Sequence, residues 1–438
     1  MRAASPLHWT VTARLRARRA ARNTLGIPRL ARYSLGWDLL AGMFTGAYMG
    51  ISFPFFVKIA RSELHAPEIA IAVMSAAPFI GNLLSPVWAR QMEGRAKMPF
   101  VIGSWVAARF LLLLIPLLAG GPWGFVALVG GLQFIGTISS PAYTSLMRDI
   151  YPDRSRGRLM GYVRVGAQTC MFFSTMAAGR LLDHTLSFRV LFPIAGLFGF
   201  AAAYAFYRVR PLPHFVPPTP TSTGSDELTT VAAKPTTREF VRDTLSILRE
   251  DEPFRWFAFS LFTYGFGNLM VQPLYALYQV DRLHISSTQI ANLANFSSLL
   301  SILGSFWWGR FMDRVGAPRT VLFSIICVTL IPLVYLSAHN WYGLLLAAGL
   351  MGFGISGVEL SYMGSILTYA NRERTAQYQS LNSLLLGVRG VTAPLIGLPL
   401  MKAFGYQKVF WIALVIMILG CFMQHLATRP ARTTTTRR

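Results

Sequence analysis

The sequence predicts an all-α polytopic membrane protein with twelve transmembrane helices, because of its composition and the lengths of its apolar runs. Of 438 residues, 53% are hydrophobic and 13% are charged, whereas about 25% are charged in an average soluble chain. Each apolar run can cross a hydrocarbon core of ~30 Å at ~1.5 Å of rise per residue. The predicted spans are residues 37–57, 68–90, 99–119, 123–146, 159–180, 188–208, 254–278, 287–309, 319–337, 341–367, 378–401 and 407–427.

Residues 1–36 form the first element, a basic cytoplasmic arm. Its first 35 residues hold eight arginines and no acid. Lysine and arginine stay on the cytoplasmic side during insertion, and 31 of the 41 lie on the side of the N-terminus, against 7 on the other side and three within spans. We therefore expect both termini in the cytoplasm and the chain in a plasma membrane, the inner membrane if the source is bacterial. This placement assigns the net charge of +23 to topology and anionic lipid headgroups rather than to nucleic acid.

Two six-helix segments, residues 37–208 and 254–427, repeat one another at an offset near 219. The matched positions are Gly46, Pro54, Leu64 and His65 with Gly265, Pro273, Leu283 and His284, and residues 88–93 with 308–313. The basic loops of both segments face the same side. We therefore expect two bundles related by a pseudo-two-fold axis along the membrane normal.

Residues 209–253 separate the two bundles as a cytoplasmic linker. Its first part is rich in proline, serine and threonine, a composition that buries too little apolar surface to order itself. Its second part, residues 236–251, has capping-box spacing and apolar residues on one helical face, which predicts a short helix along the inner membrane surface. Residues 428–438 form a basic cytoplasmic tail.

One loop after the eighth span carries a recognisable motif. Gly309, Asp313, Arg314 and Gly316 match the Gly-x-x-x-Asp-Arg-x-Gly loop of the major facilitator superfamily, which the chain resembles over about residues 37–427. The first-half copy, with Arg90, Glu93 and Arg95, is more degraded. The resemblance implies gating loops in which Asp313 contacts the start of the fifth helix near Gly157, and Glu93 contacts the start of the eleventh near Thr375. The alternative is that these charges only set topology.

Four ionisable residues lie at membrane depth, where a charge is costly and indicates function by default. Glu359 and Arg389 lie at matching depth on consecutive helices, which predicts a buried ion pair. The sequence leaves open whether this pair binds solute or protons, or only locks the two helices together. Arg109 lies on a helix that is usually peripheral in this family, and Arg164 is close enough to the inner loop to snorkel.

Polar residues on the predicted central helices are candidates for a solute cavity. By resemblance, helices one, four, seven and ten line it, with contributions from five, eight and eleven. The candidates include Thr45 and Tyr143, and the cavity set consists of Tyr48, Gln133, Tyr264, Asn268, Gln272, Glu359 and Arg389. Hydrogen bonding between helices, which favours the same residue types, is the competing explanation.

Taken together, these features predict a secondary active or facilitative transporter that moves a small polar or amphiphilic solute by rocker-switch alternating access. Its partners would be the solute, membrane lipids and a proton or other coupling ion. The excess of intramembrane arginine favours an anionic or neutral solute slightly. Alternatives are a transport-inactive assembly or sensor subunit and a membrane-embedded lipid-modifying enzyme. Histidines lie in loops or at span ends, without catalytic or metal-ligand spacing, so we expect no enzyme activity, cofactor or metal.

Overall fold

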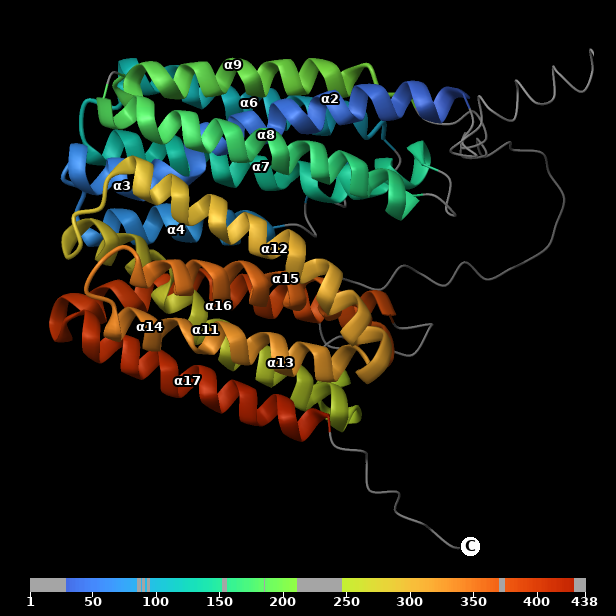
Figure 1. The fold of residues 1–438 in the computed structure, drawn as a ribbon. Helices are drawn as coiled ribbons and strands as arrows, with labels where there is room; N and C mark the ends of the chain where they lie inside the picture. Colours follow the sequence, from blue (N-terminus) through green and yellow to red (C-terminus); the bar gives the residue numbers. More distant parts are fainter. Residues whose placement is uncertain are drawn as a thin grey trace, which may run out of the picture.

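The computed structural model describes residues 29–84, 88, 91–92, 95–151, 156–184, 186–210, 246–369 and 375–428. Within these ranges the regular structure is helical, and the helices run roughly side by side in two groups that follow one another along the chain (Figure 1). The first group, the N-half, runs to α9, and the second, the C-half, begins at α11. Residues 1–28 of the predicted arm, 211–245 of the predicted linker and 429–438 of the predicted tail lie outside the described residues.

The described part of the N-half contains six long helical elements that correspond to its six predicted spans. Its first helix continues beyond α2 through short η1, α3 and η2 segments. The bounds are α2 Arg29–Ser52, η1 Phe53–Phe55, α3 Phe56–Lys58, η2 Ile59–Glu63, α4 Glu68–Leu83, α6 Met98–Leu118, α7 Pro122–Ile150, α8 Arg156–His184 and α9 Phe188–Tyr207.

The C-half repeats this order, with its third element split into two helices. Its bounds are α11 Glu252–Asp281, α12 Ser287–Val315, α13 Ala317–Thr329, α14 Ile331–Ser337, α15 Gly343–Tyr369, α16 Thr375–Phe404 and α17 Tyr406–Ala427. The Asp251 side chain caps α11, and Ser286 and Gln289 form a capping box on α12, which satisfies N–H groups left free at a helix start. Residues 246–250, part of the predicted linker helix, are helical.

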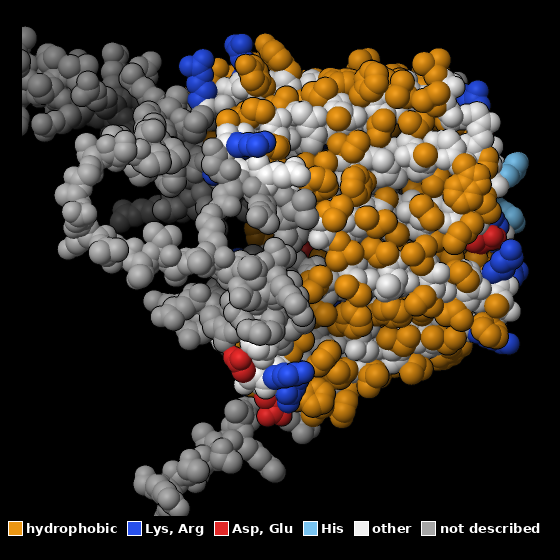
Figure 2. Space-filling view, turned by 180° about the vertical axis from the view of Figure 1, so that it is seen from behind, with side chains coloured by type: hydrophobic (Ala, Val, Ile, Leu, Met, Phe, Trp, Pro, Cys, Tyr) orange, Lys and Arg blue, Asp and Glu red, His pale blue; other side chains and the backbone are white. Residues whose placement is uncertain are grey.

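Each predicted span corresponds to a helix, although several helices are longer than their apolar runs. Among the described residues, nine helices are long and apolar enough to cross a membrane by length and composition. The other three predicted spans correspond to α4, which has 16 described helical residues, and to α8 and α11, which are not among these nine. On the face shown in Figure 2, hydrophobic side chains cover the middle, and charged side chains gather at the two ends.

The two halves repeat one another in backbone geometry as well as in sequence. His65 and His284 have φ values of 51° and 47°. The amides of Leu64 and Leu283 donate to carbonyls five residues back. Two apolar surface grooves, of about 320 Å³ between α4 and α7 and about 310 Å³ between α12 and α15, have linings that match at the same offset, for example Phe134 with Phe353. The repeat expected near 219 is thus present in the fold.

The bundles have two ends that we name for the site description. The terminal end is where α2 begins and α17 ends, and the distal end is where η2 and α8 end (Figure 1). The apolar core runs through both halves and includes large, fully buried side chains such as Phe55, Phe192 and Phe410.

Candidate functional site

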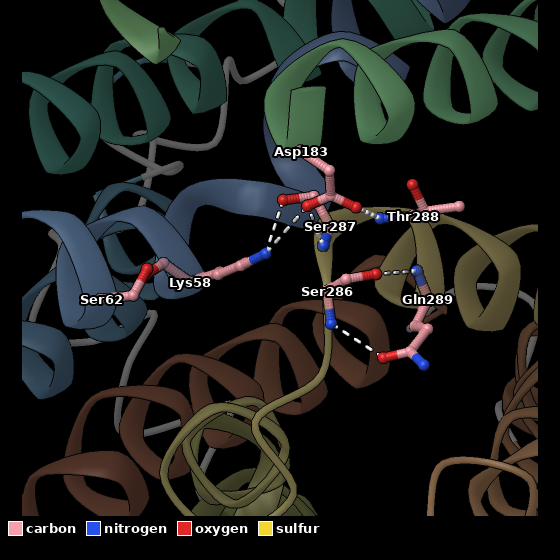
Figure 3. Close-up of polar contacts among 7 residues, drawn as sticks. All are labelled: Lys58, Ser62, Asp183, Ser286, Ser287, Thr288 and Gln289. Atoms are coloured by element: carbon pink, nitrogen blue, oxygen red, sulfur yellow. Dashed lines mark hydrogen bonds and ion pairs between the residues drawn. The ribbon is translucent and has the colours of Figure 1, made fainter. Parts of the chain in front are cut away.

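At the distal end, Asp183 connects the two halves. It lies beyond the predicted span 159–180, on the last turn of α8, and faces the first turn of α12 (Figure 3). Its carboxylate accepts hydrogen bonds from the backbone N–H groups of Ser287 and Thr288, both at 2.7 Å. Lys58 reaches the same point from α3, 3.5 Å from Asp183 and donating to the Ser287 hydroxyl at 2.6 Å.

This arrangement is a helix cap supplied from the opposite half. A carboxylate at a helix N-terminus satisfies free N–H groups and interacts favourably with the helix dipole. Burial disfavours the charge of Asp183, but the hydrogen bonds from Thr288 and Ser287 outweigh that effect and hold the pKa of this carboxyl well below its ordinary value. Asp183 is therefore ionised at neutral pH, and its contacts hold the distal end closed.

A second polar contact crosses the distal end beside the first. The Arg61 guanidinium donates to both carboxylate oxygens of Asp281, at 2.9 and 3.0 Å. Tyr406 donates to the same carboxylate at 2.9 Å, and Glu68 lies 3.4 Å from the Arg61 guanidinium. The fork-to-fork geometry of Arg61 and Asp281 fixes the relative positions of η2 and α11.

Packing closes the halves along two lines, which we name the α8/α12 seam and the α4/α16 seam. At the first, Gly179 lies so close to α12 that a Cβ there would be 2.8 Å from the Ser287 carbonyl oxygen. At the second, a Cβ on Gly390 would overlap Phe79. Near Asp183 the α8/α12 seam is polar, whereas the contacts described at the α4/α16 seam are apolar.

Toward the terminal end, the N-half contains a cavity of about 600 Å³. Its walls come from α2, α6, α7 and α8, and combine hydroxyl groups, aromatic rings and aliphatic side chains. The lining residues are Asp38, Ala41, Gly42, Thr45, Trp105, Ser139, Ser140, Tyr143, Met160, Gly161, Val163, Arg164 and Ala167. Such a mixture suits an amphiphilic organic molecule, because apolar surface supplies most of the affinity and a few polar groups orient the ligand.

Arg164 extends from this cavity to the other half. Its guanidinium lies 2.9 Å from the Glu359 carboxylate on α15, and the side chains are 67% and 55% exposed. The predicted pair of Glu359 with Arg389 is therefore wrong. Counting residues placed the two groups at matching depth, but not on facing sides of their helices. An ion pair this exposed contributes only about 0–1 kcal/mol.

Arg389 instead turns toward α11, where its guanidinium donates to the Leu261 carbonyl and lies against Gly265. Arg109 is 5% exposed, and its guanidinium lies 4.9 Å from the ring centre of Tyr48 and 4.8 Å from that of Trp105. The Nε of each arginine has no hydrogen-bond partner in the described part of the chain.

The remaining predicted cavity residues are dispersed. Tyr48 is buried against Arg109, and Gln133 donates to the Met74 carbonyl at 3.5 Å, which ties α7 to α4. Tyr264 is buried in the C-half, and Gln272 is exposed. The hydroxyl of Tyr264 and the Oδ1 of Asn268 are buried and have no hydrogen-bond partner among the described residues.

The predicted gating loops lie at the terminal end. Gly309, Asp313 and Arg314 belong to the last turns of α12, where Asp313 and Arg314 are exposed. Gly316 ends that helix with φ of 85°, a conformation that glycine adopts at little cost. Arg95 is exposed after α4. Arg90 and Glu93 lie outside the described residues, and the predicted latches stay predictions.

Asp38 is a site residue that sequence reasoning missed. It lines the cavity, is 2% exposed and accepts a hydrogen bond from the Tyr151 hydroxyl at 2.6 Å. The predicted span begins at residue 37, which put Asp38 at the membrane surface, whereas α2 begins at Arg29 and puts it nine residues into the helix. No group of histidine, cysteine and acidic residues suited to a metal ion occurs in the described ranges.

Comparison with known proteins identifies relatives of the whole chain. The family model described as Major Facilitator Superfamily matches residues 39–286 and 257–438. Multidrug resistance protein MdtG of Klebsiella pneumoniae (strain 342) is 21% identical over 406 residues, covering 88% of this chain and 91% of that protein. The Dickeya zeae (strain Ech586) protein of the same name is 22% identical over 405 residues, with 89% and 93% covered.

Solved structures share the fold. A bacterial homologue of the human lysosomal transporter Spinster, in an inward-facing and unoccupied conformation, superposes with a TM-score of 0.64 at 14% identity, over 91% of this chain and 97% of that one. A mutant of the nucleoside transporter NupG superposes with a TM-score of 0.68 at 11% identity, over 90% and 100%.

Proposed function

The chain belongs to the major facilitator superfamily and is a multi-pass membrane solute transporter, and we propose that it moves small amphiphilic organic molecules by rocker-switch alternating access. One observation carries the proposal: a cavity of mixed polarity lies toward the terminal end, while polar contacts between the halves close the distal end. Arg164 of the cavity lining reaches Glu359 of the C-half, so rocking of the two bundles would change which side of the membrane has access to this cavity.

The lining of the cavity supports an amphiphilic solute. Trp105, Met160 and Val163 offer apolar surface, whereas Tyr143 and Arg164 offer hydrogen-bond donors. The relatives' name, multidrug resistance protein, supports the same class of solute and favours export. We further propose that the terminal end faces the cytoplasm, with the chain in a bacterial inner membrane, because most of its basic residues lie on that side.

We propose that a bound solute and Glu359 compete for the guanidinium of Arg164. Because the pair is exposed, it contributes little stability, so a polar group of a bound solute could replace Glu359 as the partner of Arg164 at small cost. In this proposal the pair ties the empty halves together and separates when solute enters.

Dye transport into and out of vesicles tests the proposal. Protein reconstituted in vesicles would be assayed with an amphiphilic cationic dye, an amphiphilic anionic dye and a small polar nucleoside. We expect transport of an amphiphile, reduced in Arg164→Gln and in Trp105→Ala. Glu252→Gln is the control, because Glu252 pairs with Arg255 within the C-half, away from the cavity. Transport of the nucleoside alone, or equal rates in all variants, would overturn the assignment.

A further inference from the structure

We propose that the terminal corner between α2 and α9 binds the phosphate of an anionic phospholipid from the leaflet on that side. A pocket of about 320 Å³ at this corner is lined by Tyr33, Tyr207, Arg208 and Arg210. It is separate from the solute cavity, and none of its four lining residues belongs to the cavity lining. The inference therefore goes beyond the proposed function.

The backbone around the pocket is fixed by contacts between the two helices. The Ser34 hydroxyl donates to the Arg210 carbonyl at 2.7 Å, and the Arg210 N–H donates back to that hydroxyl at 3.2 Å. Ser34 is fully buried. These reciprocal bonds join the start of α2 to the segment after α9, so both arginines extend from a defined position.

Aromatic rings hold the Arg208 guanidinium near the membrane boundary. Its central carbon lies 5.3 Å from the ring centre of Trp37 and 5.9 Å from that of Tyr204. Cation–π contacts of this kind orient a guanidinium without neutralising its charge. Arg208 directly follows the last residue of α9, and tyrosine and tryptophan are typical of the depth where lipid headgroups lie.

The charge of the pocket fits an anion. Among the described residues of α2 and α9, Asp38 is the one acid, and its carboxylate accepts a hydrogen bond from Tyr151 and lines the separate cavity. Two guanidinium groups and two phenols therefore present hydrogen-bond donors without a carboxylate among the lining residues. A guanidinium fork matches phosphate oxygens in pairs, which favours phosphate over a single-point anion.

A lipid fits this pocket better than free phosphate does. Exposed apolar and aromatic side chains, including Leu40 at 37% and Tyr204 at 58%, lie on the same two helices. Acyl chains attached to the bound phosphate could lie along this surface, whereas inorganic phosphate would gain nothing from it. Because α2 also lines the solute cavity, lipid bound here would fasten the end of a helix that forms its wall.

Native mass spectrometry of the full chain tests the proposal. Detergent-purified protein would be titrated with phosphatidylglycerol and, separately, with zwitterionic phosphatidylcholine of the same acyl chains. We expect tighter retention of phosphatidylglycerol, weakened about tenfold or more by Arg208→Gln/Arg210→Gln. Arg189→Gln is the matched control, because Arg189 begins the same helix at the other end and also lies over a ring, that of Phe188. The control should bind as the wild type does.

Three results would overturn the proposal. The first is equal retention of the two lipids by the wild type, which needs no variant and so does not depend on folding. The second is equal loss in the Arg189→Gln control and in the double variant. The third is displacement of phosphatidylglycerol by inorganic phosphate in the millimolar range. Thermal stabilisation by inorganic phosphate in phosphatidylcholine nanodiscs that equals the stabilisation by phosphatidylglycerol would count in the same way. Either outcome would assign the site to soluble anions.

Discussion

Replacing Asp183 with asparagine should open the distal end of the protein. Asp183 accepts two backbone hydrogen bonds of 2.7 Å from α12 and lies 3.5 Å from Lys58, while its side chain is 16% exposed. Asparagine keeps one acceptor oxygen but loses the charge. Hydrogen bonds to charged groups contribute about 1.5–3 kcal/mol against about 0.5–1.5 kcal/mol for neutral ones. Because the two N–H groups bond different carboxylate oxygens, asparagine keeps one bond in a weaker, neutral form and loses the other. The cost is about 3 kcal/mol, which is about a 150-fold shift in the open-to-closed ratio.

Distances between spin labels can measure this shift. One label would replace Arg189 in the N-half and the other His339 in the C-half, both exposed near the distal end, in a background where Cys170, Cys327 and Cys421 are serine. We expect a longer-distance population to grow in Asp183→Asn and to stay at the wild-type level in Glu252→Gln, which removes an acid at the other end. An unchanged distance distribution in Asp183→Asn would refute the argument that this cap holds the halves together.

Three further predictions concern the same seam and the buried arginine. Gly179→Val should prevent closure of the distal end, because the added Cβ would lie 2.8 Å from the Cβ of Ala291. The same pair of spin labels measures this change, and distances equal to those of the wild type would contradict close packing at Gly179. The pKa of Asp183 is lowered in the closed state. The stability that its carboxylate gives to the closed state is therefore complete above the ordinary pKa of about 4 and falls as the pH drops below that value. The wild type should thus open in acid more than Asp183→Asn does. Arg109→Ala should lower the thermal unfolding midpoint more than Arg109→Met, because methionine keeps most of the buried volume; equal midpoints would show that volume is unimportant there.

The membrane spans could be predicted from the sequence because an apolar run of sufficient length has few other structures available to it. The ends of the helices could not, since polar turns continue several helices beyond the hydrocarbon layer. For this reason Asp38 was not predicted to line the cavity. The predicted span begins at residue 37, whereas α2 begins at Arg29, which places Asp38 nine residues into the helix. A carboxylate near a predicted span end was the available signal.

Contacts between helices were harder to predict than the helices themselves. Depth follows from residue counting, but the direction of a side chain around the helix axis depends on packing, and for this reason Glu359 meets Arg164 rather than Arg389. An acid capping a helix of the other half was predicted for Asp313, at the terminal end. Asp183 makes such a contact at the distal end, where the sequence around it carries no comparable loop motif.

The unlike chemistry of the two seams has a consequence for how the halves would separate. Protonating Asp183 removes charge-assisted contacts from the α8/α12 seam, but it leaves the packing of Phe79 against Gly390 on the other seam unchanged. In acid, the α8/α12 seam would therefore open while the α4/α16 seam stays packed. The two halves would rotate about the contact of Phe79 with Gly390 instead of separating evenly.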